Sequence, residues 1–170
     1  AGVQTSLGNR IEQNRRAETL RVIPEIVPGA DVAHTEEITV TGADGEPRRV
    51  FKVHNAQGEL IGWVLPTGGL GFADRIDLLI GLDAERITIT GMYVLDQKET
   101  PGLGNFIAGE PFRGQFAGKS AEEPLVVIKE DPKVGKNQIR ALGGATISSE
   151  SVANIVNTTI ANLRDALQNK

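Results

Sequence analysis

The C-terminal part of the chain carries the most regular pattern in the sequence. One face of the segment after Glu150 is formed by side chains that recur with the period of an α-helix, namely Val152, Ile155, Val156, Thr159, Ile160, Leu163, Ala166 and Leu167. Asparagines and charged residues take the other face. Because a stripe of this length has to be covered, the pattern predicts a long amphipathic helix that packs against another layer.

The middle of the chain alternates with a period of two, which is typical of strands. We predict strands over residues 51–54, 60–65, 76–82 and 86–95, and a short buried strand over 125–128. The first four make two hairpins. The breakers within 28–48 and the glycines of 66–71 predict loops.

A second helix is predicted at the N-terminal end, over residues 5–23. Pro24 is expected to end it, because the residue before a proline avoids the helical region. The order of elements is then helix, antiparallel strands, helix. This order predicts an α+β fold in which an antiparallel sheet of hairpins carries the N-terminal helix and the amphipathic C-terminal helix. The length of 170 residues fits one domain over 1–170.

Composition excludes several kinds of site. The chain has no cysteine, so disulfides, thiolate metal sites and iron–sulfur clusters are excluded. His34 and His54 are too far apart in sequence for the usual metal-binding spacings, and we predict no metal site. The net charge of −4 argues against nucleic acid as a partner. No apolar run is long enough to span a bilayer, and no signal peptide is evident.

The segment Gly143–Ser149 combines small residues and hydroxyls immediately before the C-terminal helix. The free N–H groups and the dipole of a helix start favour an anion, and glycine lets a phosphate approach the backbone. A plain alternative is that Thr146, Ser148 or Ser149 serves as the helix N-cap. The motif alone leaves both readings open.

A second motif, Glu-Thr-Pro-Gly-Leu-Gly, covers residues 99–104 directly after a predicted strand. Proline and glycine are typical of a tight turn. The same residues could bring backbone close to a flat ligand, with Leu103 as an apolar wall. This motif alone also leaves both readings open.

Together, the two motifs resemble the family of FMN-binding domains that includes the G subunit of the Rnf electron-transport complex and the C subunit of the sodium-translocating NADH:quinone reductase. Members of that family carry the ETPGLG loop after a hydrophobic strand and a segment similar to SGATxTS at the start of the last helix. Here the loop is present letter for letter at 99–104, and the segment at 143–149 reads Gly-Gly-Ala-Thr-Ile-Ser-Ser. The resemblance extends over nearly the whole chain.

The resemblance implies an FMN cofactor joined through a phosphoester to Thr146. The cofactor-binding residues that it implies are Thr146, Gly144, Ala145, Ile147, Ser148, Glu99, Thr100, Gly102, Leu103 and Gly104. It implies no catalytic side chain and no metal ligand. The domain would transfer electrons within a larger complex and would not turn over a substrate alone, since the flavin supplies the redox chemistry.

The resemblance also implies partners and a location. The partners are the other subunits of an ion-translocating redox complex in the membrane, and a flavin transferase that attaches FMN from FAD. The chain begins at Ala1 without a methionine, so we expect an N-terminal membrane anchor outside this sequence. The domain would then face the extracytoplasmic side of the cytoplasmic membrane.

Two positions depart from the family pattern, which has Asp and Ser where this chain has Arg140 and Gly143. These departures bear on recognition by the flavin transferase. Arg140 is expected either to pair with the phosphate or to be a solvated surface charge. The rival functions are an extracytoplasmic FMN-binding domain of another reductase, and a scaffold domain that has lost its flavin.

Overall fold

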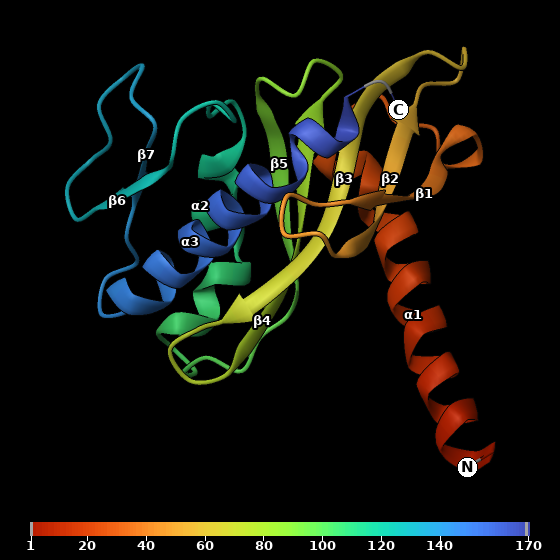
Figure 1. The fold of residues 1–170 in the computed structure, drawn as a ribbon. Coiled ribbons are helices and arrows are strands. Elements are labelled where there is room, and N and C mark those ends of the chain that lie inside the picture. Colours follow the sequence, from red (N-terminus) through yellow and green to blue (C-terminus); the bar gives the residue numbers. More distant parts are fainter. Residues whose placement is uncertain (1, 169) are drawn as a thin grey trace.

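A five-stranded antiparallel sheet in the order β1-β2-β3-β4-β5 forms the centre of the molecule (Figure 1). The structure is a computed structural model and describes residues 2–168 and 170. The strands are β1 (Glu36–Thr41), β2 (Pro47–His54), β3 (Leu60–Leu70), β4 (Arg75–Asp83) and β5 (Ile89–Asp96). The predicted α+β class with its antiparallel sheet is confirmed.

Two long helices cover opposite faces of this sheet. α3 (Thr146–Leu163) packs on the face that carries Trp63, Leu65 and Ile80. The last turns of α1 (Gly2–Ile26) pack on the other face, against Val64 and its neighbours. The two faces follow from the alternation of side chains along each strand. No helix among residues 2–168 is long and apolar enough to cross a membrane.

Shorter elements complete the layer on the α3 side. They are α2 (Glu110–Arg113), the 3₁₀ segments Gly104–Ala108, Gly114–Phe116 and Asp165–Leu167, and a small parallel pair of β6 (Val126–Ile128) and β7 (Gln138–Arg140). A further 3₁₀ segment, Val32–His34, lies beside α1 and β2. Phe112 and Phe116, which contact edge to face, and Ile107 are buried in the core cluster that contains α3. The short strand over 125–128 was predicted within one residue, whereas β7 was not predicted.

Three sequence-based predictions are wrong in ways that packing explains. Pro24 does not end the first helix, because burial of Ile23 and Ile26 holds the chain helical to Ile26. Residues 28–48 are not all loop, since β1 pairs with β2 over its whole length. The 66–71 segment is not a loop either, because β3 continues to Leu70 in register with β4.

The glycines in that segment serve close packing. A Cβ at Gly69 would lie 2.8 Å from Cγ1 of Ile155 on α3, and one at Gly68 would clash with Oδ1 of Asp77. Contacts under about 3 Å force neighbouring atoms to move. Glycine therefore lets α3 and the β4 side chains lie directly on the strand.

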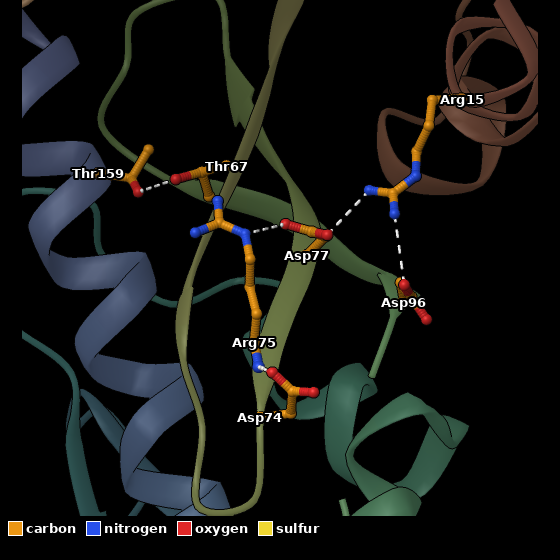
Figure 2. Close-up of polar contacts among 7 residues, drawn as sticks. All are labelled: Arg15, Thr67, Asp74, Arg75, Asp77, Asp96 and Thr159. Atoms are coloured by element: carbon orange, nitrogen blue, oxygen red, sulfur yellow. Dashed lines mark hydrogen bonds and ion pairs between the residues drawn. The ribbon is translucent and has the colours of Figure 1, made fainter. Parts of the chain in front are cut away.

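Polar contacts join both helices to the sheet (Figure 2). On one face, Nη1 of Arg15 in α1 donates to Oδ2 of Asp77 at 2.9 Å, and Nη2 donates to Asp96 at 3.3 Å. On the other face, the hydroxyls of Thr67 and Thr159 are 2.7 Å apart. Exposed ion pairs contribute about 1 kcal/mol or less, so these contacts orient helices that apolar burial holds in place.

We predict that Ile26→Ala lowers the free energy of unfolding by about 2–5 kcal/mol, the usual cost of truncating a buried isoleucine. Ile26 is 1% exposed, and its backbone lies against Gly81 and Gly91 of the sheet. Urea denaturation followed by circular dichroism measures the change. Val134→Ala, at a fully exposed side chain, is the control and should stay within about 0.5 kcal/mol. Equal stability of the two variants would contradict this account of how α1 is held.

Candidate functional site

A hollow of about 300 Å³ lies where the start of α3 meets the turn after β5. One wall is formed by Phe72, Thr100, Leu103 and Gly104, and the other by Gly144, Ala145, Thr146, Ile147 and Ser148. The two sequence motifs, far apart along the chain, thus share one cavity. Eight of the residues singled out from the sequence line it.

Glu99 lies beneath the hollow and holds its walls together. Its side chain is 3% exposed. Oε1 accepts hydrogen bonds from the Phe72 N–H at 2.7 Å and from the Ser148 hydroxyl at 2.8 Å, and Oε2 accepts from the Ala73 N–H at 2.8 Å. Glu99 is absent from the lining residues, so it supports the cavity and does not form its surface.

The surroundings of Glu99 favour its ionised form. Burial by itself raises the pKa of the carboxyl group, since it removes water from the charge. The hydrogen bonds from the Ala73 N–H, the Ser148 hydroxyl and the Phe72 and Asp74 N–H groups together outweigh burial and bring the pKa below its ordinary value of 4.5. A charged Glu99 is therefore the form that fits this site.

The N-terminus of α3 is open toward the hollow. Ala145 is the N-cap residue and makes no side-chain capping bond, so the alternative in which Thr146, Ser148 or Ser149 caps the helix is wrong. Ser148 donates to Glu99, and Ser149 donates to the Ala145 carbonyl while accepting from the Leu142 N–H. The N–H groups of the first turn have no acceptor within the helix.

The remaining predicted residues lie around this centre. Gly144 has a φ of 75°, and a Cβ there would lie 3.0 Å from Cδ2 of Leu103, so glycine lets the two motifs approach. Gly102 is exposed at the tip of the turn and does not line the hollow. At Gly143, a Cβ would meet nothing within 4 Å, so packing does not require glycine where the family has serine. Arg140 on β7 pairs with Asp131 and is not among the lining residues.

Phe72 was not identified from the sequence. It occupies the turn between β3 and β4 and is 62% exposed. Together with Leu103 and Ile147, which are 42% and 56% exposed, it gives the hollow apolar walls. The sequence did offer a clue, because Phe72 is one of few aromatic residues in the chain and follows a glycine. Phe72 was passed over because it adjoins the 66–71 segment, which was interpreted as a loop.

Comparison with known proteins identifies the family. The family model for the FMN-binding domain matches residues 71–161 of the sequence, a span that contains both motifs and Phe72. The chain belongs to the FMN-binding domain family. The sequence-based identification of that family is confirmed.

Relatives of this FMN-binding domain include subunits of ion-translocating complexes. It is 38% identical over 80% of its length to the G subunit of the Na⁺-translocating ferredoxin:NAD⁺ oxidoreductase complex of Acetobacterium woodii, of which it spans 65%. It is 33% identical to the G subunit of the ion-translocating oxidoreductase complex of Methanosarcina acetivorans, over 80% of this chain and 70% of that protein.

The fold is also similar to a solved structure. NqrC from Shewanella oneidensis superimposes with a TM-score of 0.65 and 25% identity, over 71% of this chain and 59% of that chain. The two structures thus share the α+β arrangement of sheet and helices.

We predict that Glu99→Gln lowers the stability of this FMN-binding domain at pH 7 by about 1–3 kcal/mol, because an amide cannot accept all of these hydrogen bonds. The pKa of Glu99 is lower in the folded than in the unfolded state. The contribution of the carboxylate is therefore complete above the unfolded value, near 4.5, and is lost as pH falls through the folded pKa. The difference between the parent and Glu99→Gln should shrink below that pH.

Urea denaturation at a series of pH values measures this difference. Glu130→Gln, at an exposed position, is the control and should track the parent throughout. If the difference in unfolding free energy between the parent and Glu99→Gln stayed constant at acidic pH, the charge of Glu99 would not be what joins the 99–104 turn to the β3–β4 turn and the start of α3.

Proposed function

We propose that this domain holds FMN in the hollow between the 99–104 turn and the start of α3, and that it transfers electrons within an ion-translocating oxidoreductase complex of the Rnf or Nqr type. The convergence of the two motifs on one cavity is the observation that carries the proposal. Membership in the FMN-binding domain family gives the cofactor, and the relatives from Acetobacterium woodii and Methanosarcina acetivorans support the type of complex.

The open start of α3 suits the phosphate end of FMN. The unbonded N–H groups of its first turn and the positive end of the helix dipole stabilise an anion. Gly143 and Gly144 add no side chain of their own at the approach to these groups, and the space beside Gly143 is open. A phosphate at this point would satisfy donors for which the described residues supply no acceptor.

The apolar walls suit the ring end of FMN. Phe72, Leu103 and Ile147 are large, apolar and exposed around one hollow, whereas scattered exposed apolar residues would carry no such meaning. A flat aromatic ring placed between them would bury their surfaces. The redox chemistry belongs to the flavin, while these side chains set its position and surroundings.

Among the hydroxyls at the start of α3, where the phosphate is proposed to lie, that of Thr146 is best placed for a covalent bond. It is half-buried at the lining of the hollow, and no hydrogen bond within residues 2–168 engages its Oγ1. The Ser148 and Ser149 hydroxyls are buried and engaged in bonds to Glu99 and the backbone. In the bond proposed, the Thr146 oxygen replaces the AMP leaving group on the FMN phosphorus of FAD, and a flavin transferase carries out the exchange.

The setting of the domain is part of the same proposal. Residues 1–170 form one FMN-binding domain, anchored to the cytoplasmic membrane by a segment preceding Ala1 and facing the extracytoplasmic side. Electrons would enter and leave through neighbouring subunits. The exposure of Phe72 and Leu103 at the mouth of the hollow would leave one edge of a bound ring accessible to such neighbours.

We predict that Thr146→Ala abolishes flavin that survives acid precipitation, because Thr146 supplies the proposed attachment oxygen while the nearby Ser148 and Ser149 hydroxyls are engaged in hydrogen bonds. The chain is produced together with a flavin transferase, and intact mass and in-gel flavin fluorescence are measured. Thr158→Ala, an exposed threonine further along α3, is the control and should keep its covalent flavin. Flavin still attached in Thr146→Ala would exclude this residue as the attachment point, and a colourless parent chain would favour a flavin-free scaffold.

We also predict that Phe72→Ala weakens reversible FMN binding about tenfold, since stacking on an aromatic side chain contributes about 1–3 kcal/mol. Titration of FMN into chains that carry Thr146→Ala, followed by quenching of flavin fluorescence, measures the affinity without the covalent bond. Phe106→Ala is the matched control, because Phe106 is 52% exposed but does not line the hollow. Equal losses in both variants would argue against a ring beside Phe72.

A further inference from the structure

The edge of β3 is open along its second half. β2 pairs with β3 only from Leu60 to Val64, and its N-terminal half turns away to pair with β1 alone. Beyond Val64, β3 continues to Leu70 with β4 as its single partner among the described strands. A strand with one partner presents a row of unpaired backbone groups on its other side.

The register identifies those groups. The Gly71 N–H donates to the Asp74 carbonyl at 2.8 Å and closes the hairpin. In an antiparallel ladder, bonded and non-bonded pairs alternate, so Gly69 and Thr67 bond to β4. Gly68 and Leu70 direct both their N–H and C=O groups outward. The outward groups of Gly68 and those of Leu70 are therefore about 6.8 Å apart along the edge, the rise of two residues in a strand.

Space for a further strand lies beside this edge. A cavity of about 480 Å³ runs between Thr67–Leu70 and the polar face of α3, and one of about 580 Å³ lies on the α1 side of Pro66 and Thr67. Leu70 is 80% exposed. Pro66 lacks an N–H, so the segment that can accept a full ladder begins after it.

Positively charged side chains beside the edge, on the side of α1, indicate which side chains an added strand would carry. The side chains of Arg16 and Arg49 are 57% and 71% exposed and share one acid, Glu37, at 2.7 and 3.7 Å. Both arginines line the cavity beside Pro66. One carboxylate between two guanidinium groups leaves positive charge, which favours Asp or Glu on the strand that enters.

We propose that an extended, acidic segment of a partner subunit adds to the sheet at the outer edge of β3, with its main chain bonded to Gly68 and Leu70. This inference rests on the proposed function, because it assigns the docking surface through which the domain joins its complex. A second extended backbone offers donors and acceptors at the spacing of this edge. The same strand leads through Gly71 to Phe72 in the β3–β4 turn, so a segment docked here lies beside the proposed flavin site.

The test compares Leu70→Pro with Leu70→Thr. Both remove the exposed leucine side chain, but only proline removes the outward N–H, and neither disturbs a bond to β4. The two flavin-loaded variants are titrated against an Rnf- or Nqr-type complex purified from cells that lack this chain. We expect Leu70→Pro to bind about fivefold more weakly, the usual effect of one lost hydrogen bond, and Leu70→Thr to bind like the parent. Flavin absorbance should be unchanged in both.

Hydrogen–deuterium exchange of the unaltered chain gives a second measurement that needs no variant. The amides of Gly68 and Leu70 should exchange fast in the free chain and slowly in the assembled complex. Equal binding of the two variants, or edge amides that exchange as fast after assembly as before, overturns the proposal. A concentration-dependent dimer of the isolated chain that Leu70→Pro abolishes also overturns it, because the occupant is then a second copy. Failure of the parent chain to join the complex overturns the proposed function, and this inference with it.

Discussion

The carboxylate of Glu99 accepts hydrogen bonds from the backbone of the β3–β4 turn and from the Ser148 hydroxyl at the start of α3. Three segments distant in sequence thereby meet at one buried charge. The arrangement is stable because several donors compensate for the water that burial removes. Phe72, the 99–104 turn and the first turn of α3 keep their relative positions through this group, and the hollow between them depends on it.

The sheet supports this site by holding a helix on each face. Glycines at 68, 69, 81 and 91 remove the side chains that would keep α1, α3 and the charged residues of β4 away from the strands. The close approach brings the N-terminus of α3 level with the turns that follow β3 and β5. A helix held further from the sheet would leave the two motifs without a shared cavity, however well each was formed locally.

Phosphate binding, ring binding and docking would use different parts of one short stretch of structure. Within the described part of the chain, the start of α3 offers free N–H groups and the open hydroxyl of Thr146, the turn beyond β3 offers Phe72, and the edge of β3 offers unpaired backbone groups. Each part uses groups that the fold leaves unsatisfied. For a domain that passes electrons as proposed, this proximity would place the bound cofactor beside the partner.

The sequence by itself determined the α+β class, the amphipathic α3, the hairpins and both motifs, because these depend on residue spacing and turn chemistry that act locally. It misassigned 66–71 and missed β1, since the pairing of a strand depends on a partner elsewhere in the chain. It also left open which hydroxyl near Thr146 caps the helix. Only the tertiary structure shows that the Ser148 and Ser149 hydroxyls make buried hydrogen bonds and that Glu99 lies behind the hollow as an acceptor. It also shows that Phe72 lines the hollow. Burial and hydrogen bonding between distant segments decide these outcomes, and no local pattern encodes them.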